Sequence, residues 1–145
     1  MASWRRKALA LFPDLKFEVQ RPDFSVYQIF FRILPMSRDA HKAGDVDTLR
    51  KIYGFAEWCF EQRAKEMWNA AGVAFYEHLF DDHPSLRAEV VQWLPPRVIV
   101  GCMGLWGWRL SPNDLATVKK LIDARRVSPY RDARLSTGAG RSPTA

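Results

Sequence analysis

The most apolar stretch of the chain is residues 24–42, FSVYQIFFRILPMSRDAHK. Apolar side chains recur there at the i, i+3, i+7 and i+10 spacing of one helix face, as Phe24, Tyr27, Phe31 and Leu34. Four more apolar residues widen this stripe around most of the circumference: Val26, Ile29, Phe30 and Ile33. A helix that is apolar nearly all round normally lies in the middle of a bundle. We therefore expect a central helix over 24–42.

Start and stop signals flank this helix. Asp23 is placed to cap its first turn, and Pro35, which lacks an amide hydrogen, is expected to kink or break it. Gly44 can adopt the left-handed conformation that ends a helix, and Asp45 can cap the next one. The sequence therefore predicts a helix–helix corner at Gly44-Asp45.

Helical periodicity also dominates the rest of the chain, and no run of clean polar/apolar alternation with hairpin turns supports a sheet. Ser111-Pro112-Asn113-Asp114 is the strongest helix start, with Ser111 as cap and Pro112 in the first helical position. Helical segments are predicted at about 2–11, 14–20, 46–63, 64–80, 84–93 and 112–126.

The sequence leaves two alternatives for residues 97–108, a short buried helix or a strand. Their Val98, Ile99 and Val100 favour extended structure, while three glycines within the segment disfavour any stable isolated element. With this segment left open, the fold class is all-α, an irregular or HEAT-like bundle of about five to seven helices. We expect one helical domain over residues 1–126 and a disordered basic tail over 127–145, where Ser, Thr, Pro, Gly, Ala and Arg dominate.

The net charge of +6 arises at the two ends of the chain. Residues 1–7 hold three basic residues, and residues 124–145 hold five arginines against one aspartate, so the body between them is close to neutral. A nucleic-acid-binding protein usually carries its basic stripe on the folded face. Basic ends add non-specific phosphate affinity at most, so nucleic acid is an unfavoured partner.

Cys59 and Cys102, the only cysteines, lie among large apolar residues and are expected to be buried structural thiols. Two cysteines do not form the disulfide framework of a small secreted protein, which favours the reducing cytoplasm. The apolar run after the first basic residues, 8–12, is too short for a signal sequence. The longest strongly apolar stretch, 98–108, is far shorter than the about 20 residues that span a bilayer, so no membrane partner is expected.

No motif for catalysis or metal binding is recognisable. The three histidines, His41, His78 and His83, lack the spacing of metal ligands, and the carboxylates beside His78 and His83 are interpreted as helix caps and turns. Gly-x-Ser-x-Gly, a Walker A loop and a dinucleotide glycine fingerprint are all absent from the sequence. We therefore expect no enzyme activity, no catalytic residue, no metal and no cofactor.

Carboxylates and tryptophans recur in the middle of the chain. Glu57 and Glu61 are i, i+4 on a helix face expected to be exposed, and Trp58 and Trp68 are the tryptophans expected to be most exposed. Exposed tryptophan beside carboxylates is a typical composition of protein-interface hot spots. We predict a partner-binding surface formed by Glu57, Trp58, Glu61, Trp68, Asp81 and Asp82. The alternative is a merely solvated acidic face.

Three motifs carry a family resemblance: Phe12-Pro13-Asp14-Leu15, Gly44-Asp45-x-x-x-Leu49 and Asn69-Ala70-x-Gly72-Val73-x-Phe75-x-Glu77-His78-Leu79. Over about residues 10–123 the chain resembles an uncharacterised family of small all-helical bacterial domains associated with immunity proteins encoded beside polymorphic or contact-dependent toxins. The resemblance brings no catalytic residues. It implies that the chain neutralises a cognate toxin by tight binding.

Three hypotheses about function follow. The first is a cytosolic protein-binding module, most concretely an immunity protein that neutralises a bacterial toxin through a basic surface on that toxin. The second is a nucleic-acid-associated helical protein that acts through its basic termini, in which case removal of 127–145 abolishes binding. The third is an enzyme without a recognisable motif, whose sign would be a perturbed acid or base in a deep pocket.

Overall fold

The computed structural model describes residues 1–125, and within that range the chain forms eight α-helices and no strand. The helices, in chain order, are α1 Ser3–Leu11, α2 Lys16–Val19, α3 Val26–Ala43, α4 Val46–Phe60, α5 Lys65–Ala74, α6 Arg87–Val90, α7 Pro96–Arg109 and α8 Pro112–Ala124. Four short 3-10 turns link them: Pro13–Leu15, Tyr76–His78, Pro84–Leu86 and Val91–Trp93. The predicted all-α class is confirmed, with one helix more than the upper estimate. The predicted tail over 127–145 lies outside the described residues.

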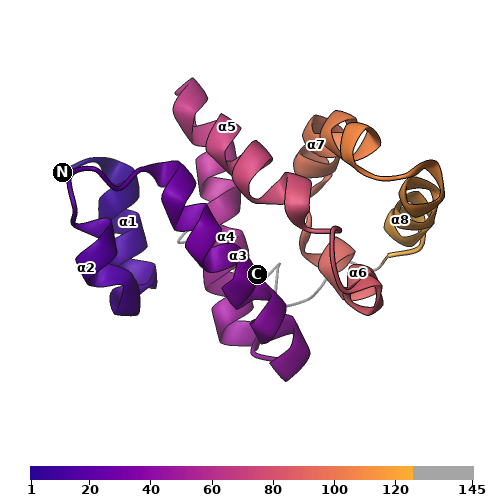
Figure 1. The fold of residues 1–145 in the computed structure, drawn as a ribbon, viewed down its shortest axis with the longest axis horizontal. Helices are drawn as coiled ribbons and strands as arrows, with labels where there is room; N and C mark the ends of the chain where they lie inside the picture. The colour runs from indigo at the N-terminus through magenta and orange to yellow at the C-terminus, as the bar shows by residue number, and fades with distance from the viewer. Residues whose placement is uncertain (126–145) are drawn as a thin grey trace, which may run out of the picture.

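Helix α3 lies in the middle of the molecule, against α4 and α5, with α1 and α2 on one side and α6 to α8 on the other (Figure 1). Ile29, Phe30 and Ile33 on this helix are fully buried, which confirms the expected central helix. Phe31 is 58% exposed, so the stripe that included it is not the buried face. The reason is that α4 and α5 cover one side of α3 and leave the other in water.

The predicted corner at Gly44 is confirmed, whereas the predicted start of α3 is wrong. Gly44 has a φ of +69°, and the carboxylate of Asp45 accepts a hydrogen bond from the amide of Thr48. The residue that caps α3 is Ser25, which forms a reciprocal capping box with Gln28. Helix α3 also continues through Pro35, which lies on its exposed side, where water can bind the carbonyl that proline leaves without a partner.

Two predicted helices are shorter in the structure. The helix expected over 64–80 ends at Ala74, because Phe75 leaves helical geometry and buries its ring 5.7 Å from that of Phe30 and 5.7 Å from that of Tyr53. The segment expected as one helix over 84–93 is divided into two 3-10 turns and the single-turn α6. The residue before it, His83, has a left-handed φ of 52° and no side-chain cap.

Residues 97–108 are helical, which settles the choice that the sequence left open. Val98, Cys102 and Trp106 form the buried side of α7, and the indole nitrogen of Trp106 donates to the backbone carbonyl of Tyr76 at 2.8 Å. A Cβ atom at Gly101 would lie 2.8 Å from the Phe60 ring. That glycine therefore allows the ring to contact the helix backbone, and tertiary packing outweighs its low helix propensity.

Ser111 caps α8 as predicted, since its hydroxyl accepts from the amide of Asp114 at 3.1 Å. Helix α8 packs beside α6 and α7 and has a single fully buried side chain, Val118. Leu115, Leu121 and Ile122 on the same helix are only partly buried. Among residues 1–125, no helix has the length and apolar character needed to cross a membrane.

Candidate functional site

The structure separates the six residues predicted to bind a partner. Glu57 is 6% exposed, so its assignment to a solvated face is wrong. At 100° per residue Glu57 lies on the side of α4 that carries Tyr53 and Glu61, which contact Trp93 and Arg97. Helix α1 packs on another side of α4, so α4 buries a wider arc than one amphipathic stripe. Trp58 is half-buried, stacked on Phe55 with Lys7 over its ring, rather than exposed.

The other four predicted residues are at least partly accessible. Glu61 is exposed at the end of α4 and forms an ion pair with Arg97 of α7 at 3.0 Å. Trp68 is exposed on α5, as expected. Asp81 and Asp82 lie on the loop between α5 and α6, where Asp81 is half-buried and Asp82 exposed. The predicted group is therefore not one contiguous patch.

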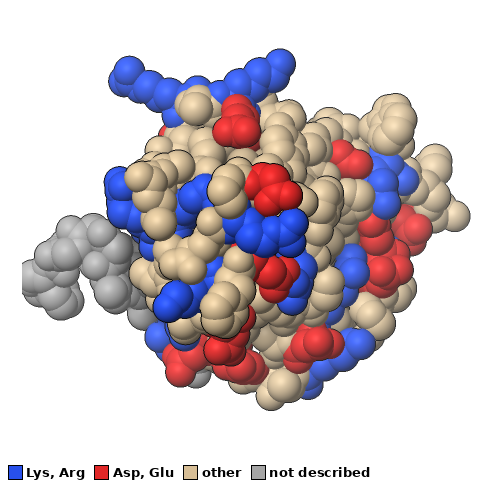
Figure 2. Space-filling view, turned by 60° about the vertical axis from the view of Figure 1, so that its left-hand side comes forward, with Lys and Arg blue, Asp and Glu red and all other residues tan. Residues whose placement is uncertain are grey.

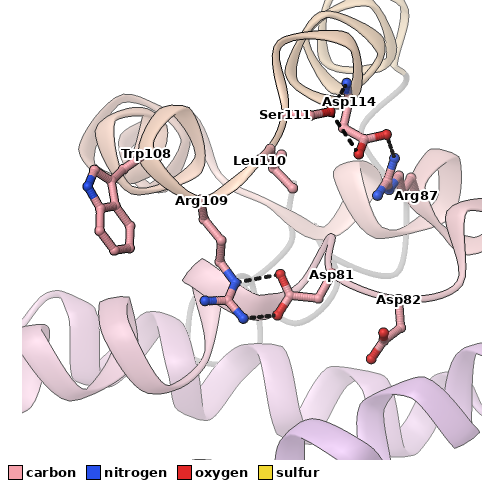
Figure 3. Close-up of a pocket in the computed structure, with 8 residues that line it drawn as sticks. All are labelled: Asp81, Asp82, Arg87, Trp108, Arg109, Leu110, Ser111 and Asp114. Atoms are coloured by element: carbon pink, nitrogen blue, oxygen red, sulfur yellow. Dashed lines mark hydrogen bonds and ion pairs between the residues drawn. The ribbon is translucent and has the colours of Figure 1, made fainter.

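Asp81 and Asp82 contribute to a polar hollow of about 600 Å³ that opens to solvent between the α5–α6 loop and the α7–α8 corner (Figure 3). We call this site the polar hollow. Its lining consists of Asp81, Asp82, Arg87, Trp108, Arg109, Leu110, Ser111 and Asp114. The lining thus holds three carboxylates, two guanidinium groups and one indole ring.

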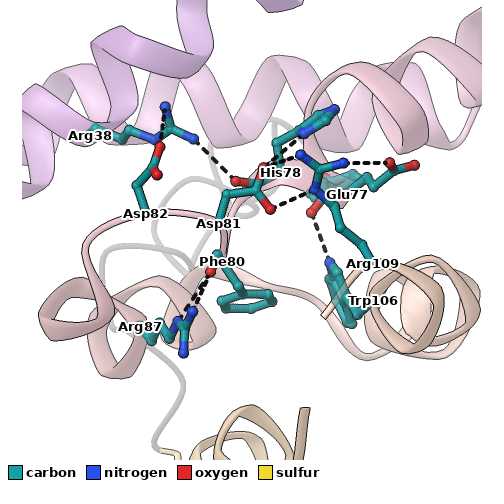
Figure 4. Close-up of polar contacts among 10 residues, drawn as sticks. Arg38, Glu77, His78, Phe80, Asp81, Asp82, Arg87, Trp106 and Arg109 are labelled. Carbon is teal, nitrogen blue, oxygen red and sulfur yellow. Dashed lines mark hydrogen bonds and ion pairs between the residues drawn. The ribbon is translucent and has the colours of Figure 1, made fainter. Parts of the chain in front are cut away.

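Asp81 and Arg109 form the strongest pair in the polar hollow. The guanidinium of Arg109 donates to both carboxylate oxygens of Asp81, at 2.6 and 2.7 Å, and His78 lies 3.0 Å from the second oxygen (Figure 4). Burial disfavours the charged form of Asp81, but the hydrogen bonds from Arg109 and His78 outweigh it and keep the pKa of Asp81 below its usual value. The hydrogen bond to Asp81 also raises the pKa of Arg109. Both groups therefore stay charged near neutral pH.

Arg87 joins three segments beneath the polar hollow. Its Nε and one terminal nitrogen donate to the backbone carbonyl of Phe80 at 3.2 and 2.6 Å, and the other terminal nitrogen contacts Asp114 at 3.1 Å. Hydrogen bonds from Arg87 and Ser111 lower the pKa of Asp114. The side chain of Arg87 thereby ties the α5–α6 loop and α6 to the first turn of α8.

Trp108 is the functional candidate that the sequence analysis missed. It is 83% exposed at the edge of the polar hollow, where its indole points away from the Arg109–Asp81 pair (Figure 3). A sequence signal for this position exists, because Trp108 follows Val100 and Gly104 at helical spacing. It could be used only once 97–108 was known to be a helix.

A second polar cluster lies inside the bundle and joins α3, α4 and α6. His41 contacts Glu89 through Nδ1, and its Nε2 lies 2.7 Å from the hydroxyl of Tyr53. Burial lowers the pKa of His41 despite the opposing effect of Glu89, and burial raises the pKa of Tyr53. Tyr53 is fully buried and stacked on Trp93, so it is inaccessible to a substrate. We interpret this cluster as a set of polar contacts that stabilises the packing of the three helices.

The remaining reactive groups are buried or lack a ligand-binding arrangement. Cys59 and Cys102 are fully buried free thiols, as expected, and burial raises the pKa of both. In the described part of the chain, no three His, Cys, Asp or Glu side chains gather as metal ligands do. In the polar hollow the pKa values of Asp81 and Asp114 are lowered and the pKa of Arg109 is raised, so all three shift away from neutral pH. Such shifts are typical of ion pairs, whereas a group that transfers protons usually has a pKa near the working pH.

The basic residues near the N-terminus take part in the fold. Arg5 donates to the backbone carbonyls of Arg21 and Phe24 at 2.8 and 2.6 Å, and Arg6 donates to that of Met1 at 2.6 Å. On the face shown in Figure 2, Lys and Arg side chains are interspersed with Asp and Glu. That face therefore lacks the continuous basic stripe typical of a nucleic-acid interface.

Comparison with known families gives one match. Residues 5–102 match the model of a family described as a domain of unknown function, DUF7674. The matched range covers more than half of the chain and ends within α7. The comparisons with curated proteins and with solved structures found no match.

Proposed function

We propose that this chain, which belongs to the DUF7674 family, is a cytoplasmic protein-binding module and, most concretely, an immunity protein that neutralises a cognate bacterial toxin by direct binding. The observation that carries the proposal is the exposed Trp108 at the edge of the polar hollow. Trp108 is 83% exposed, so a partner that covers its indole buries a large apolar surface. That burial is enough for the residue to act as an interface hot spot.

The charges of the polar hollow favour a basic partner. Each of its carboxylates has an arginine partner, with Arg38 from outside the lining paired to Asp82 at 3.5 Å, but the carboxylates of Asp82 and Asp114 keep half or more of their surface in water. One basic side chain of the partner can stack on Trp108, and others can reach these two carboxylates on the opposite side of the polar hollow (Figure 3). Electrostatic attraction between opposite charges would also speed the encounter of the two proteins.

The proposed surface revises the residues inferred from the sequence. Asp81 and Asp82 remain in it, Trp108 is added, and Glu57 is withdrawn because it is buried. Asp81 positions Arg109 and is expected to contribute through that ion pair rather than by direct contact. The exposed residues Glu61 and Trp68 lie on other elements and stay predictions.

The proposal is tested by expressing the chain together with a candidate toxin domain encoded beside its gene and measuring host growth. The wild-type chain should restore growth, and purified toxin should bind it in calorimetry. We expect Trp108→Ala to weaken binding by about 2 kcal/mol, or roughly thirtyfold. Asp82→Lys should also weaken toxin binding, and more so as the salt concentration is lowered. The reason is that low salt screens less of the repulsion between the new positive charge and the basic surface of the toxin.

Phe17→Ala is the matched control, since Phe17 is 84% exposed but belongs to α2. It should leave both growth rescue and affinity unchanged. Growth rescue that persists in the Trp108→Ala and Asp82→Lys variants would reject the polar hollow as the binding surface. Failure of the wild-type chain to bind or neutralise the encoded toxin would reject the immunity function itself.

A further inference from the structure

Helix α7 presents an outward face whose centre, Gly104, is left open by the other described elements, while Phe60 and Leu115 reach its edges at Gly101 and Gly107. All six residues of this face are exposed: Arg97, Val100, Gly101, Gly104, Gly107 and Trp108. Successive residues of an α-helix are rotated by about 100° around its axis, so the other five residues point within about 60° on either side of Gly104. The two large apolar side chains among them, Val100 and Trp108, are 80% and 83% exposed. Together the six residues form what we call the α7 face.

No contact among residues 1–125 explains why position 104 is a glycine. A Cβ atom at Gly101 would clash with the Phe60 ring, but a Cβ atom at Gly104 would meet nothing within 4 Å. A glycine inside a helix costs about 1 kcal/mol relative to alanine, so an unneeded glycine at an exposed position is unfavourable for the isolated chain. A glycine at the centre of a helix face does allow another helix to approach its backbone closely.

The α7 face is symmetric about Gly104 in its residue types. Val100 and Trp108 lie four residues to either side, and Gly101 and Gly107 lie three residues to either side. Two copies of α7 that pack antiparallel about a two-fold axis at Gly104 place Val100 of one copy level with Trp108 of the other. A two-fold interface requires this kind of self-complementary surface.

The charges at the ends of α7 fit the same arrangement. Arg97 lies seven residues before Gly104, and Ser111, at the mouth of the polar hollow, lies seven residues after it. In an antiparallel pair, Arg97 of one copy therefore lies level with the polar hollow of the other, where the carboxylates of Asp82 and Asp114 are 60% and 50% exposed although each already pairs with an arginine. The side chain of Arg97 is 64% exposed and free to extend beyond its ion pair with Glu61.

We propose that the α7 face binds a second copy of this chain, antiparallel and centred on Gly104, to form a two-fold symmetric dimer. Apolar contact of Val100 with the second copy's Trp108, close backbone approach at Gly104 and insertion of Arg97 at the polar hollow hold the two copies together. Trp108 is shared with the surface proposed for the toxin, so the dimer and the toxin complex exclude each other. The dimer is nevertheless measured on the purified full chain without toxin. If no dimer forms, the separate test of toxin binding is unaffected.

The first experiment is sedimentation equilibrium of the full chain over a range of concentrations. The wild-type chain should reach twice the mass of a single chain, and Gly104→Leu should weaken the dimer at least tenfold because its side chain separates the two helices. Leucine favours a helix over glycine, so this variant should melt no lower than the wild-type monomer. Val100→Asp, a second variant at an exposed position, should weaken the dimer similarly, whereas Phe17→Asp, off the α7 face, should not.

The second experiment is disulfide trapping with Gly104→Cys under mild oxidation. A residue on the two-fold axis of a close helix pair faces its own copy, so a covalent dimer should form, while Phe17→Cys should give none above background. The native cysteines are fully buried and should not contribute. A wild-type chain that stays monomeric at every concentration would overturn the proposal. A dimer whose stability is the same in Gly104→Leu and Val100→Asp would overturn it equally.

Discussion

Replacing Arg87 with methionine should be among the most destabilising single changes on the α6–α8 side of the molecule. Arg87 is 5% exposed and donates two hydrogen bonds to the carbonyl of Phe80, a residue that is itself fully buried. Methionine keeps the apolar stem but leaves that carbonyl without its charged donor. Loss of a hydrogen bond from a charged group, with a buried acceptor left unsatisfied, costs about 2–4 kcal/mol.

The assay is urea unfolding followed by circular dichroism, with thermal melting as a second measure. For a chain of this length each kcal/mol corresponds to about 2–4 °C, so we expect the melting temperature to fall by roughly 10 °C. Arg21→Met is the control, because Arg21 and its partner Asp23 are both well exposed and their ion pair should contribute nothing measurable.

A loss of less than about 1 kcal/mol in Arg87→Met would refute the reasoning, since it would mean that the Phe80 carbonyl finds another donor. A double-mutant cycle with Asp114→Ala separates the two contacts of Arg87. We expect most of the loss to persist when Asp114 is already absent, because that carboxylate faces water and the Phe80 carbonyl does not. A loss that vanished in the Asp114→Ala background would assign the stabilisation to the ion pair instead.

Three further outcomes are expected. Ser111→Ala should destabilise the chain by about 1 kcal/mol in urea unfolding through loss of the α8 cap, and an unchanged midpoint would count against that cap. Cys59 and Cys102 should not react with a thiol reagent at pH 8 until denaturant is added, since both are buried and burial raises the pKa of Cys102 to about 12; rapid labelling of the native chain would contradict this. Because the pKa of His41 is lower in the folded chain than its ordinary value of 6.5, the unfolded chain takes up the proton more readily, so stability should be full above about pH 6.5 and fall as the pH drops towards the lowered value. His41→Asn should flatten this slope in unfolding experiments between pH 8 and 5, and an unaltered slope would show that other groups cause it.

The features that the sequence predicted correctly depend on residues close together in the chain. The Gly44-Asp45 corner and the Ser111 cap involve contacts within three or four positions, so the local pattern contains all the partners that these structures need. The burial of the two cysteines followed in the same way from their apolar neighbours. Capping of α3 shows the limit of such reasoning, because the sequence analysis assigned the cap to Asp23, whereas Ser25 forms the capping box with Gln28.

The features that sequence reasoning missed depend on contacts between distant segments. Phe75 ends α5 because its ring fits between Phe30 and Tyr53, residues more than twenty positions away. Glu57 is buried on the side of α4 where Tyr53 and Glu61 contact the distant residues Trp93 and Arg97, and no periodicity within α4 reveals these contacts. Trp108 became a candidate only when 97–108 proved helical.

The sequence by itself determined an all-helical chain and several of its corners, because helix propensity, capping and glycine or proline breaks act over a few neighbouring residues. Only the tertiary structure decided which face of each helix meets water, because burial is set by the helices that pack against it. The polar hollow and the α7 face exist for the same reason. The residues of the polar hollow come together from the α5–α6 loop, α6, α7 and α8, and the exposure of the α7 face depends on where these elements pack, which no local pattern contains.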